Sequence, residues 1–309
     1  MRLVQLRDFG TPRAGWFVHR KEIIPVPPRR VWKALTEPDE LVQWWCDDAE
    51  VELQQGGSYR FSGNSVFGQT DEPPKLATSA EDAVITEFRP EERLQFRWTL
   101  DGTETLVTFD LENLMELTEL RVLQTADKAP ASWTLSDDAP NWWWIALPNL
   151  RSHIENGRAT LRVNYRDDAR EPPFTLSADF TTFPWVIWSK LTLNEELSKW
   201  WNDDATIDIT GSREFTFGDA KVGPQNVVDA DEGRLLRHDW HWGDGPPTTI
   251  EWKIEDTDDA TRVTLSDLGP WDSSVRRDYR LIYWASRLLL LKQMSERGVT
   301  PSEYQDDQG

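Results

Sequence analysis

The chain has 309 residues and a formal net charge of -20, from 54 acidic and 34 basic side chains. This negative excess opposes binding to nucleic acid phosphates or to an anionic membrane surface, so neither is expected as a partner. The single cysteine, Cys46, excludes a disulfide within one chain,. No run of about 18 apolar residues offers a membrane span, and MRLVQLRDFG carries charges where a signal peptide needs an apolar stretch,. We therefore expect a cytoplasmic protein.

The predicted elements of the first half form one strand, two short helices, several strands and a last helix. Residues 16–26 alternate as a strand does, two short helices follow at 29–35 and 39–45, and 49–53 and 58–63 form a hairpin,. Further strands are expected at 83–88, 93–100, 104–111 and 116–125, and the last helix at 141–156. Such a sheet buries its faces only by curling around the last helix, which can leave a pocket between them.

The second half repeats this pattern. VWKALTEPDELVQWWCDDAEVEL at 31–53 matches IWSKLTLNEELSKWWNDDATIDI at 187–209, an offset of 156 residues,. The ends of both copies are helical and finish on Gly157 and Gly298. We predict two domains of one fold, at 1–157 and 174–309, joined by a polar linker at 158–173,.

The motifs VWKALTEPDELVQWW, ITEFRPEERLQFRWTL and LPNLRSHIENG resemble the family of heat-shock protein 90 ATPase activator homologues. This family belongs to the START-like (SRPBCC) superfamily. The resemblance implies an α+β fold with two tandem helix-grip domains, each a curved antiparallel sheet wrapped around a long C-terminal helix. It also implies either ligand binding in the grip or a chaperone-linked role in protein interaction, because one fold hosts many activities.

The repeated WWxDDA phrase is interpreted as structural, with tryptophans that fill the space between the second short helix and the sheet. Acidic residues just past a helix C-terminus oppose its dipole, so we expect local partners, either backbone amides of the next turn or an arginine such as Arg60 or Arg213,. The histidines of HDWHW, His238 and His241, point to opposite faces of a strand and do not predict a zinc site,. No catalytic residue, metal or cofactor is predicted.

Tryptophan is unusually frequent, with 18 residues, and broad rings can fill a core or wall a cavity,. We predict a site for a small apolar or aromatic ligand in the first copy, where Pro148 interrupts the last helix and widens the space beneath it,. The predicted lining is Trp98, Phe109, Trp133, Trp143 and Leu147, with Arg97 or Arg60 as the polar handle. Two alternatives stay open: interaction with a chaperone or another protein, and a cavity enzyme that uses a general acid or base.

Overall fold

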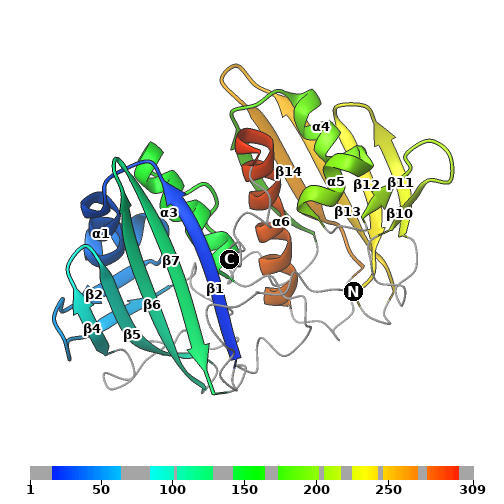
Figure 1. Ribbon diagram of the computed structural model, residues 1–309. Helices are drawn as coiled ribbons and strands as arrows, with labels where there is room; N and C mark the ends of the chain where they lie inside the picture. Colours follow the sequence, from blue (N-terminus) through cyan, green and yellow to red (C-terminus); the bar gives the residue numbers. More distant parts are fainter. Residues whose placement is uncertain are drawn as a thin grey trace. The chain divides into compact units, whose positions relative to one another are not determined.

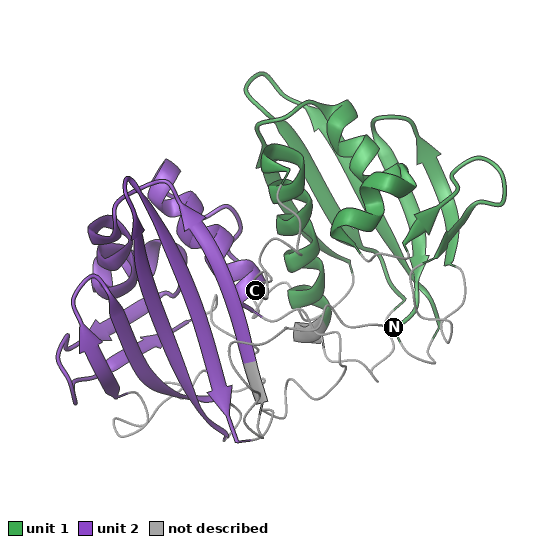
Figure 2. Cartoon of the chain, in the orientation of Figure 1, with its two compact units in different colours: residues 1–4, 163–303 green, residues 5–162, 304–309 purple. Residues whose placement is uncertain are grey.

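The computed structural model describes residues 16–63, 84–100, 103–127, 142–163, 173–201, 205–216, 225–242, 246–270 and 277–298. The described chain divides into two compact units, with the boundary between Arg162 and Val163. We call the part up to Arg162 domain 1 and the part from Val163 domain 2. In Figure 2, domain 1 is purple (unit 2) and domain 2 is green (unit 1).

Domain 1 is an antiparallel sheet with its helices on one face (Figure 1). Its strands pair in the order β1-β7-β6-β5-β4, with β2 and β3 as a separate hairpin that a bridge between Ser58 and Val84 joins to β4. The elements in chain order are β1 (Trp16–Ile24), α1 (Pro28–Thr36), α2 (Pro38–Trp44), β2 (Asp48–Val51), β3 (Tyr59–Ser62), β4 (Ile85–Arg89), β5 (Arg93–Leu100), β6 (Thr103–Leu114), β7 (Leu117–Ala126) and α3 (Trp143–Asn156).

Domain 2 repeats the same order of elements, which confirms the predicted duplication of an α+β helix-grip fold. Its strands form one antiparallel sheet in the order β8-β14-β13-β12-β11-β10-β9. The elements are β8 (Phe174–Phe180), α4 (Pro184–Thr192), α5 (Asn194–Trp200), β9 (Thr206–Ile207), β10 (Glu214–Thr216), β11 (Gln225–Asp231), β12 (Leu235–Trp240), β13 (Thr248–Asp256), β14 (Thr261–Asp267) and α6 (Arg277–Arg297).

Local sequence explains where these elements begin and end. Pro28, Pro38 and Pro184 each open a short helix, a position where the missing N–H of proline costs nothing,. Gly157 ends α3 in a left-handed conformation with φ of 76°, and its N–H donates to the His153 carbonyl at 2.8 Å,. None of the helices in the described ranges is both long and apolar enough to cross a membrane.

The strands place alternate side chains against the helices, as their sequence period requires. In β5 the inward side chains are Leu94, Phe96 and Trp98, all buried. At the equivalent positions of domain 2, β12 buries Leu236, His238 and Trp240. The core of each domain therefore lies between the sheet and its long helix.

Candidate functional site

The first tryptophan of each repeated pair ties the two short helices together. The Nε1 of Trp44 donates to the Ala34 carbonyl at 2.9 Å, and the Nε1 of Trp200 donates to the Lys190 carbonyl at 2.9 Å. Both indoles are buried. The same bond at equivalent positions explains why the first ring of the pair occurs in both copies.

The second tryptophan of each pair is the centre of an aromatic core. Trp45 lies within 4.7–6.4 Å, centroid to centroid, of the rings of Trp44, Tyr59, Phe61, Trp98, Phe109, Trp142 and Trp143. Trp201 does the same in domain 2, within 5.0–6.3 Å of Trp200, Phe215, His238, Trp240, Trp252 and Trp284. These mostly edge-to-face contacts favour the structural interpretation of the repeated phrase.

Four residues of the predicted ligand site meet in the core of domain 1. Trp98, Phe109, Trp143 and Leu147 are all buried there, and Phe109 lies 5.8 Å from Trp143 between ring centroids. Trp133 lies outside the described residues. The rings of this described interior pack against one another around Trp45.

The two predicted polar handles face away from this core. Arg97 lies between the buried Phe96 and Trp98, so it points to the opposite face of β5, where it is 40% exposed and 3.8 Å from Glu104,. Arg60 likewise alternates with buried Tyr59 and Phe61 and pairs with Glu50 at 3.0 Å. The structure does not bring either arginine together with the four core residues.

Other polar side chains face the core where α3 begins. Gln124 of β7 is fully buried; its Nε2 donates to Thr105 Oγ1 at 2.9 Å, and its Oε1 accepts from Trp143 Nε1 at 2.9 Å. On the neighbouring strand β1, Arg20 is buried with its guanidinium carbon 4.2 Å from the centroid of the Trp144 ring. We call these residues the polar end of domain 1: Arg20, Thr105, Gln124, Trp143 and Trp144.

Sequence reasoning missed the polar end, although the sequence carries a signal for it. The strand at 16–24 alternates, and its inward side chains are Val18, Arg20, Glu22 and Ile24. Two charged residues thus occupy inward positions of a strand. Buried charges are rare unless they are paired or functional, so this pattern marks the place to look.

Domain 2 builds the equivalent region differently. Gln124 pairs with Val18 across the sheet and Asp267 pairs with Phe174, at positions related by the offset of 156. Asp267 accepts hydrogen bonds from Thr248 Oγ1 and from the Gly269 N–H, and the NH1 of buried Arg280 lies 3.9 Å from its Oδ2. A buried carboxylate thus meets a buried guanidinium, where domain 1 has a neutral amide.

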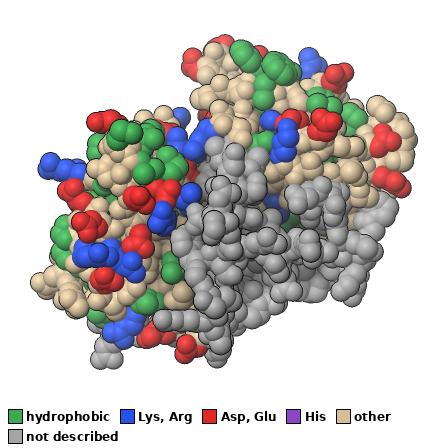
Figure 3. Space-filling view, viewed as in Figure 1, with side chains coloured by type: hydrophobic (Ala, Val, Ile, Leu, Met, Phe, Trp, Pro, Cys, Tyr) green, Lys and Arg blue, Asp and Glu red, His purple; other side chains and the backbone are tan. Residues whose placement is uncertain are grey.

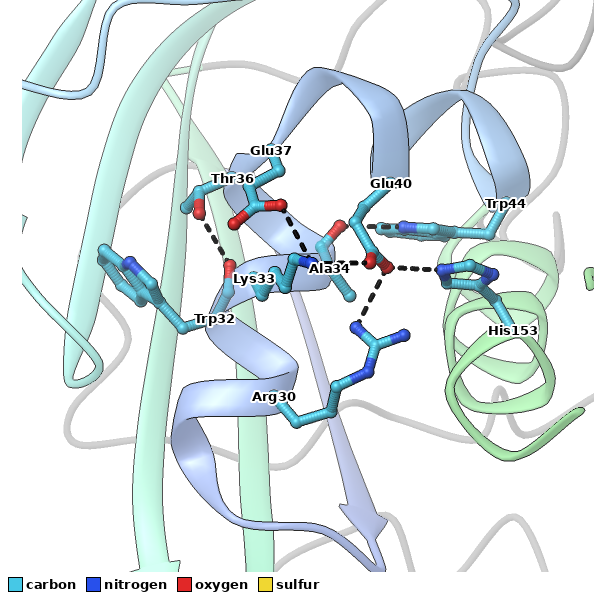
Figure 4. Close-up of polar contacts among 9 residues, drawn as sticks. All are labelled: Arg30, Trp32, Lys33, Ala34, Thr36, Glu37, Glu40, Trp44 and His153. Atoms are coloured by element: carbon cyan, nitrogen blue, oxygen red, sulfur yellow. Dashed lines mark hydrogen bonds and ion pairs between the residues drawn. The ribbon is translucent and has the colours of Figure 1, made fainter. Parts of the chain in front are cut away.

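A second polar cluster of domain 1 joins α2 to α3 (Figure 4). The Glu40 carboxylate accepts from Arg30 NH1 at 2.9 Å and lies 2.6 Å from His153 Nε2, and Lys33 Nζ lies 3.6 Å away. Burial raises the pKa of Glu40, but the His153 hydrogen bond and the charge of Arg30 outweigh it and hold this pKa below its ordinary value,. Glu40 is therefore ionised, and it joins α2 to Arg30 of α1 and His153 of α3.

In domain 1, Asp47 of the repeated acidic pair is bound by Arg162, whereas Arg60 pairs with Glu50. Arg162 donates to the Val42 and Cys46 carbonyls and to Asp47 Oδ1, each at 2.7 Å. It thereby satisfies the C-terminal end of α2 as well as the acid beyond it. Arg213 instead binds the Val227 and Val228 carbonyls. The second acidic pair, at 203–204, lies outside the described residues.

The polar groups with shifted pKa values in domain 2 also have structural explanations. Burial lowers the pKa of His238 to about 4, and its Nε2 accepts from Trp252 Nε1 at 3.3 Å. Hydrogen bonds from Lys190 and Lys199 lower the pKa of Glu196, and backbone N–H groups of a turn lower that of Asp208. A general base working near neutral pH needs a carboxylate pKa raised toward 7, the opposite direction. No three metal-ligating side chains cluster among the residues that were described.

Comparison with known proteins identifies the family. A family model described as "Activator of Hsp90 ATPase homolog 1-like protein" matches residues 25–155 and 182–291. A search of curated proteins found no match. DynU16, a protein of the dynemicin biosynthetic locus, is 19% identical over 92% of this chain and 100% of that chain, with a TM-score of 0.38.

Two further solved structures match single halves of the chain. The Aha1 protein of Colwellia psychrerythraea, solved as a dimer, is 21% identical over 41% of this chain and 97% of that chain, with a TM-score of 0.35. CalU16 of Micromonospora echinospora is 19% identical over 45% of this chain and 73% of that chain, with a TM-score of 0.34. The family assignment rests on the two segments that the family model matches. The chain belongs to the Activator of Hsp90 ATPase homolog 1-like family, with one family domain in each half.

Proposed function

We propose that domain 1 binds a small apolar or aromatic molecule between α3 and the sheet. The observation that carries this proposal is the polar end: an interior walled by aromatic rings that terminates in a few buried polar side chains. Small-molecule sites are typically built this way, with apolar walls and a few placed polar groups that fix the orientation of the ligand. Gln124 and Arg20 then take the role that sequence reasoning gave to Arg60 or Arg97.

Binding in this interior replaces ring–ring contacts around Trp45 with ring–ligand contacts. The intrinsic tryptophan fluorescence of the protein is expected to change when an aromatic ligand binds. A panel of apolar and aromatic compounds, screened by thermal unfolding of the whole chain, identifies the first ligand. Isothermal titration calorimetry then measures its affinity.

A matched pair of variants locates the site. Leu147 of α3 and Leu288 of α6 are both buried and lie ten residues before the glycine that ends each helix, since 157 minus 147 and 298 minus 288 both equal ten. Leu147→Trp fills the interior of domain 1, and Leu288→Trp fills that of domain 2. We expect Leu147→Trp to abolish binding and Leu288→Trp to preserve it. Loss of binding only in Leu288→Trp, or no bound compound at all, contradicts the proposal.

A second candidate function is interaction with a heat-shock protein 90 chaperone through domain 2. The specific observation is an exposed apolar trio on α4 and its flanks: Phe183 and Trp185, each 68% exposed, and Leu193, 56% exposed. Figure 3 shows hydrophobic side chains at the upper surface of this domain. Exposed aromatic groups of this kind are typical anchors of protein interfaces.

Domain 1 supplies the substitutions that test this candidate. At the offset of 156, Arg29 and Glu37 stand where domain 2 has Trp185 and Leu193. If the chain stimulates the ATPase activity of a purified chaperone of this class, the double variant Trp185→Arg/Leu193→Glu should lose that stimulation. Met115→Glu, at the 89% exposed Met115 of domain 1, is the control and should retain it. Equal stimulation by all three proteins, or none by the unaltered chain, removes this candidate.

A further inference from the structure

Arg20 is a buried cation inside domain 1. It lies on β1 between Glu22 and Val18, on the strand face that also carries core residue Ile24. Its side chain reaches the first turn of α3, where Trp144 covers the guanidinium plane at 4.2 Å. Only 9% of the residue is exposed.

The guanidinium of Arg20 has no carboxylate partner among the described residues. Its NH1 donates to the His19 carbonyl at 2.8 Å, while its buried Nε has no hydrogen-bond partner. Neighbouring Glu22 is engaged by Arg151 at 3.2 Å. Burial lowers the pKa of Arg20 to about 9 through desolvation, so the group stays protonated at neutral pH,. The result is a buried positive charge without a counter-charge among the described residues.

The other buried arginine of the described chain is paired with a carboxylate. Arg280 faces Asp267, and the half-buried Arg151 pairs with Glu155 at 2.7 Å as well as with Glu22. Domain 2 has Leu176 at the position equivalent to Arg20, by the offset of 156. The fold therefore forms without a cation here. An unpaired buried charge is costly, and no described carboxylate pairs with Arg20, so its presence in domain 1 favours an anionic ligand at this position.

We propose that Arg20 binds the carboxylate of an organic anion whose apolar body lies in the ring cluster of domain 1. This inference rests on the proposed function and names the class of its ligand: an aromatic or apolar carboxylic acid. A guanidinium binds a carboxylate through parallel N–H donors, and the Nε edge of Arg20 is available for this. Stacking on Trp144 holds the guanidinium plane in place for such a contact.

The test compares matched ligands on the full-length chain. 2-Naphthoate and 2-naphthamide have the same ring system, but only the first carries a negative charge at neutral pH. Titration calorimetry should show that the carboxylate binds roughly tenfold to a hundredfold more tightly than the amide, since a hydrogen bond to a charged group is worth that much. Arg20→Gln should remove this preference, so that the two ligands bind with similar affinity.

Lys21→Gln is the matched control, because Lys21 lies on the same strand but pairs with Glu119 at 3.3 Å on the opposite face. It should keep the preference. Without ligand, Arg20→Leu, which installs the domain 2 residue, should raise the unfolding temperature, because it removes an unpaired buried charge.

The outcomes separate this inference from the proposed function. Equal affinity for the two ligands, or a preference that survives Arg20→Gln, overturns the carboxylate site while the apolar site stands. A lower unfolding temperature in Arg20→Leu also counts against it, since Arg20 would then be a structural group. Failure of both ligands and of the whole apolar panel to bind overturns both proposals.

Discussion

The interiors of domains 1 and 2 differ most where the long helix begins. Domain 2 places Asp267 and Arg280 together, so that a buried carboxylate and a buried guanidinium balance each other. Domain 1 has Gln124 at the position of Asp267 and an arginine, Arg20, that no described carboxylate balances. The two copies of one fold thus share their aromatic centre and differ in the charges buried beside it.

The largest expected effect comes from removing the central tryptophan ring of each domain in turn. Trp45→Ala and Trp201→Ala should each destabilise their own domain by about 3–5 kcal/mol, because each leaves a large cavity in a packed core. Hydrogen exchange followed by mass spectrometry reports the loss of protection domain by domain. Trp185→Ala, at an exposed indole, should change stability by less than about 0.5 kcal/mol. If Trp201→Ala reduced protection in domain 1 as much as in domain 2, the two cores would not be independent.

The unfolding stability of the two domains should depend differently on pH, and this effect is smaller than that of the tryptophan substitutions. Burial depresses the pKa of His238 to about 4, and the equivalent position of domain 1 holds Phe96. As pH falls, His238 is protonated near pH 6.5 in the unfolded chain but only near pH 4 in the folded one. Domain 2 is therefore fully stable with respect to this group above pH 6.5, and it loses stability as pH falls from 6.5 toward 4. The total loss amounts to about 3 kcal/mol.

Unfolding of the two domains at pH 7 and pH 5 is the measurement. Domain 2 should lose stability from this group between the two pH values, and His238→Phe, which installs the domain 1 residue, should abolish that loss. An unchanged pH dependence in His238→Phe would show that other groups cause it.

The smallest expected effect concerns the ends of the second short helices. Arg162 binds the end of α2, while in domain 2 Arg287 of α6 donates to the Trp201 carbonyl at the end of α5, at 3.2 Å. Each arginine-to-alanine variant should destabilise its own domain by about 1 kcal/mol, because the contacts are partly exposed. Arg162→Lys should rescue little, since an ammonium cannot span three acceptors as a guanidinium does.

Arg158→Ala is the control for this prediction, because Arg158 lies exposed in the same segment. Urea unfolding gives the free energies. If Arg158→Ala lowered the free energy of unfolding as much as Arg162→Ala, the cause would be the net charge of the segment and not the contacts at the helix end.

The architecture could be predicted from sequence because its signals are local or repeated. Alternation indicated the inward faces of strands such as β5 and β12, and the WW pairs revealed the duplication. The burial of Trp98, Phe109, Trp143 and Leu147 followed from the same periodicity. Whether any ligand binds among them stays a prediction.

The polar contacts were not predictable because they join residues far apart in the chain. Arg162 reaches Asp47 across 115 positions, and His153 reaches Glu40 across 113. Periodicity tells which face a side chain occupies, but not which distant group lies opposite. The orientation of Arg60 and Arg97 has a related reason: both are adjacent to buried aromatic residues in sequence and therefore point to the other face of their strands.

The segment after α3 has a practical consequence for dividing the chain. Asn149 of α3 exchanges two hydrogen bonds with the backbone of Leu161, at 2.7 and 3.0 Å, and Arg162 holds the end of α2. Residues 158–162 are thus part of the first domain. A fragment of domain 1 for separate study should therefore end after Val163. A fragment that ends at Gly157 would lose the hydrogen bonds of Leu161 with α3 and of Arg162 with the end of α2.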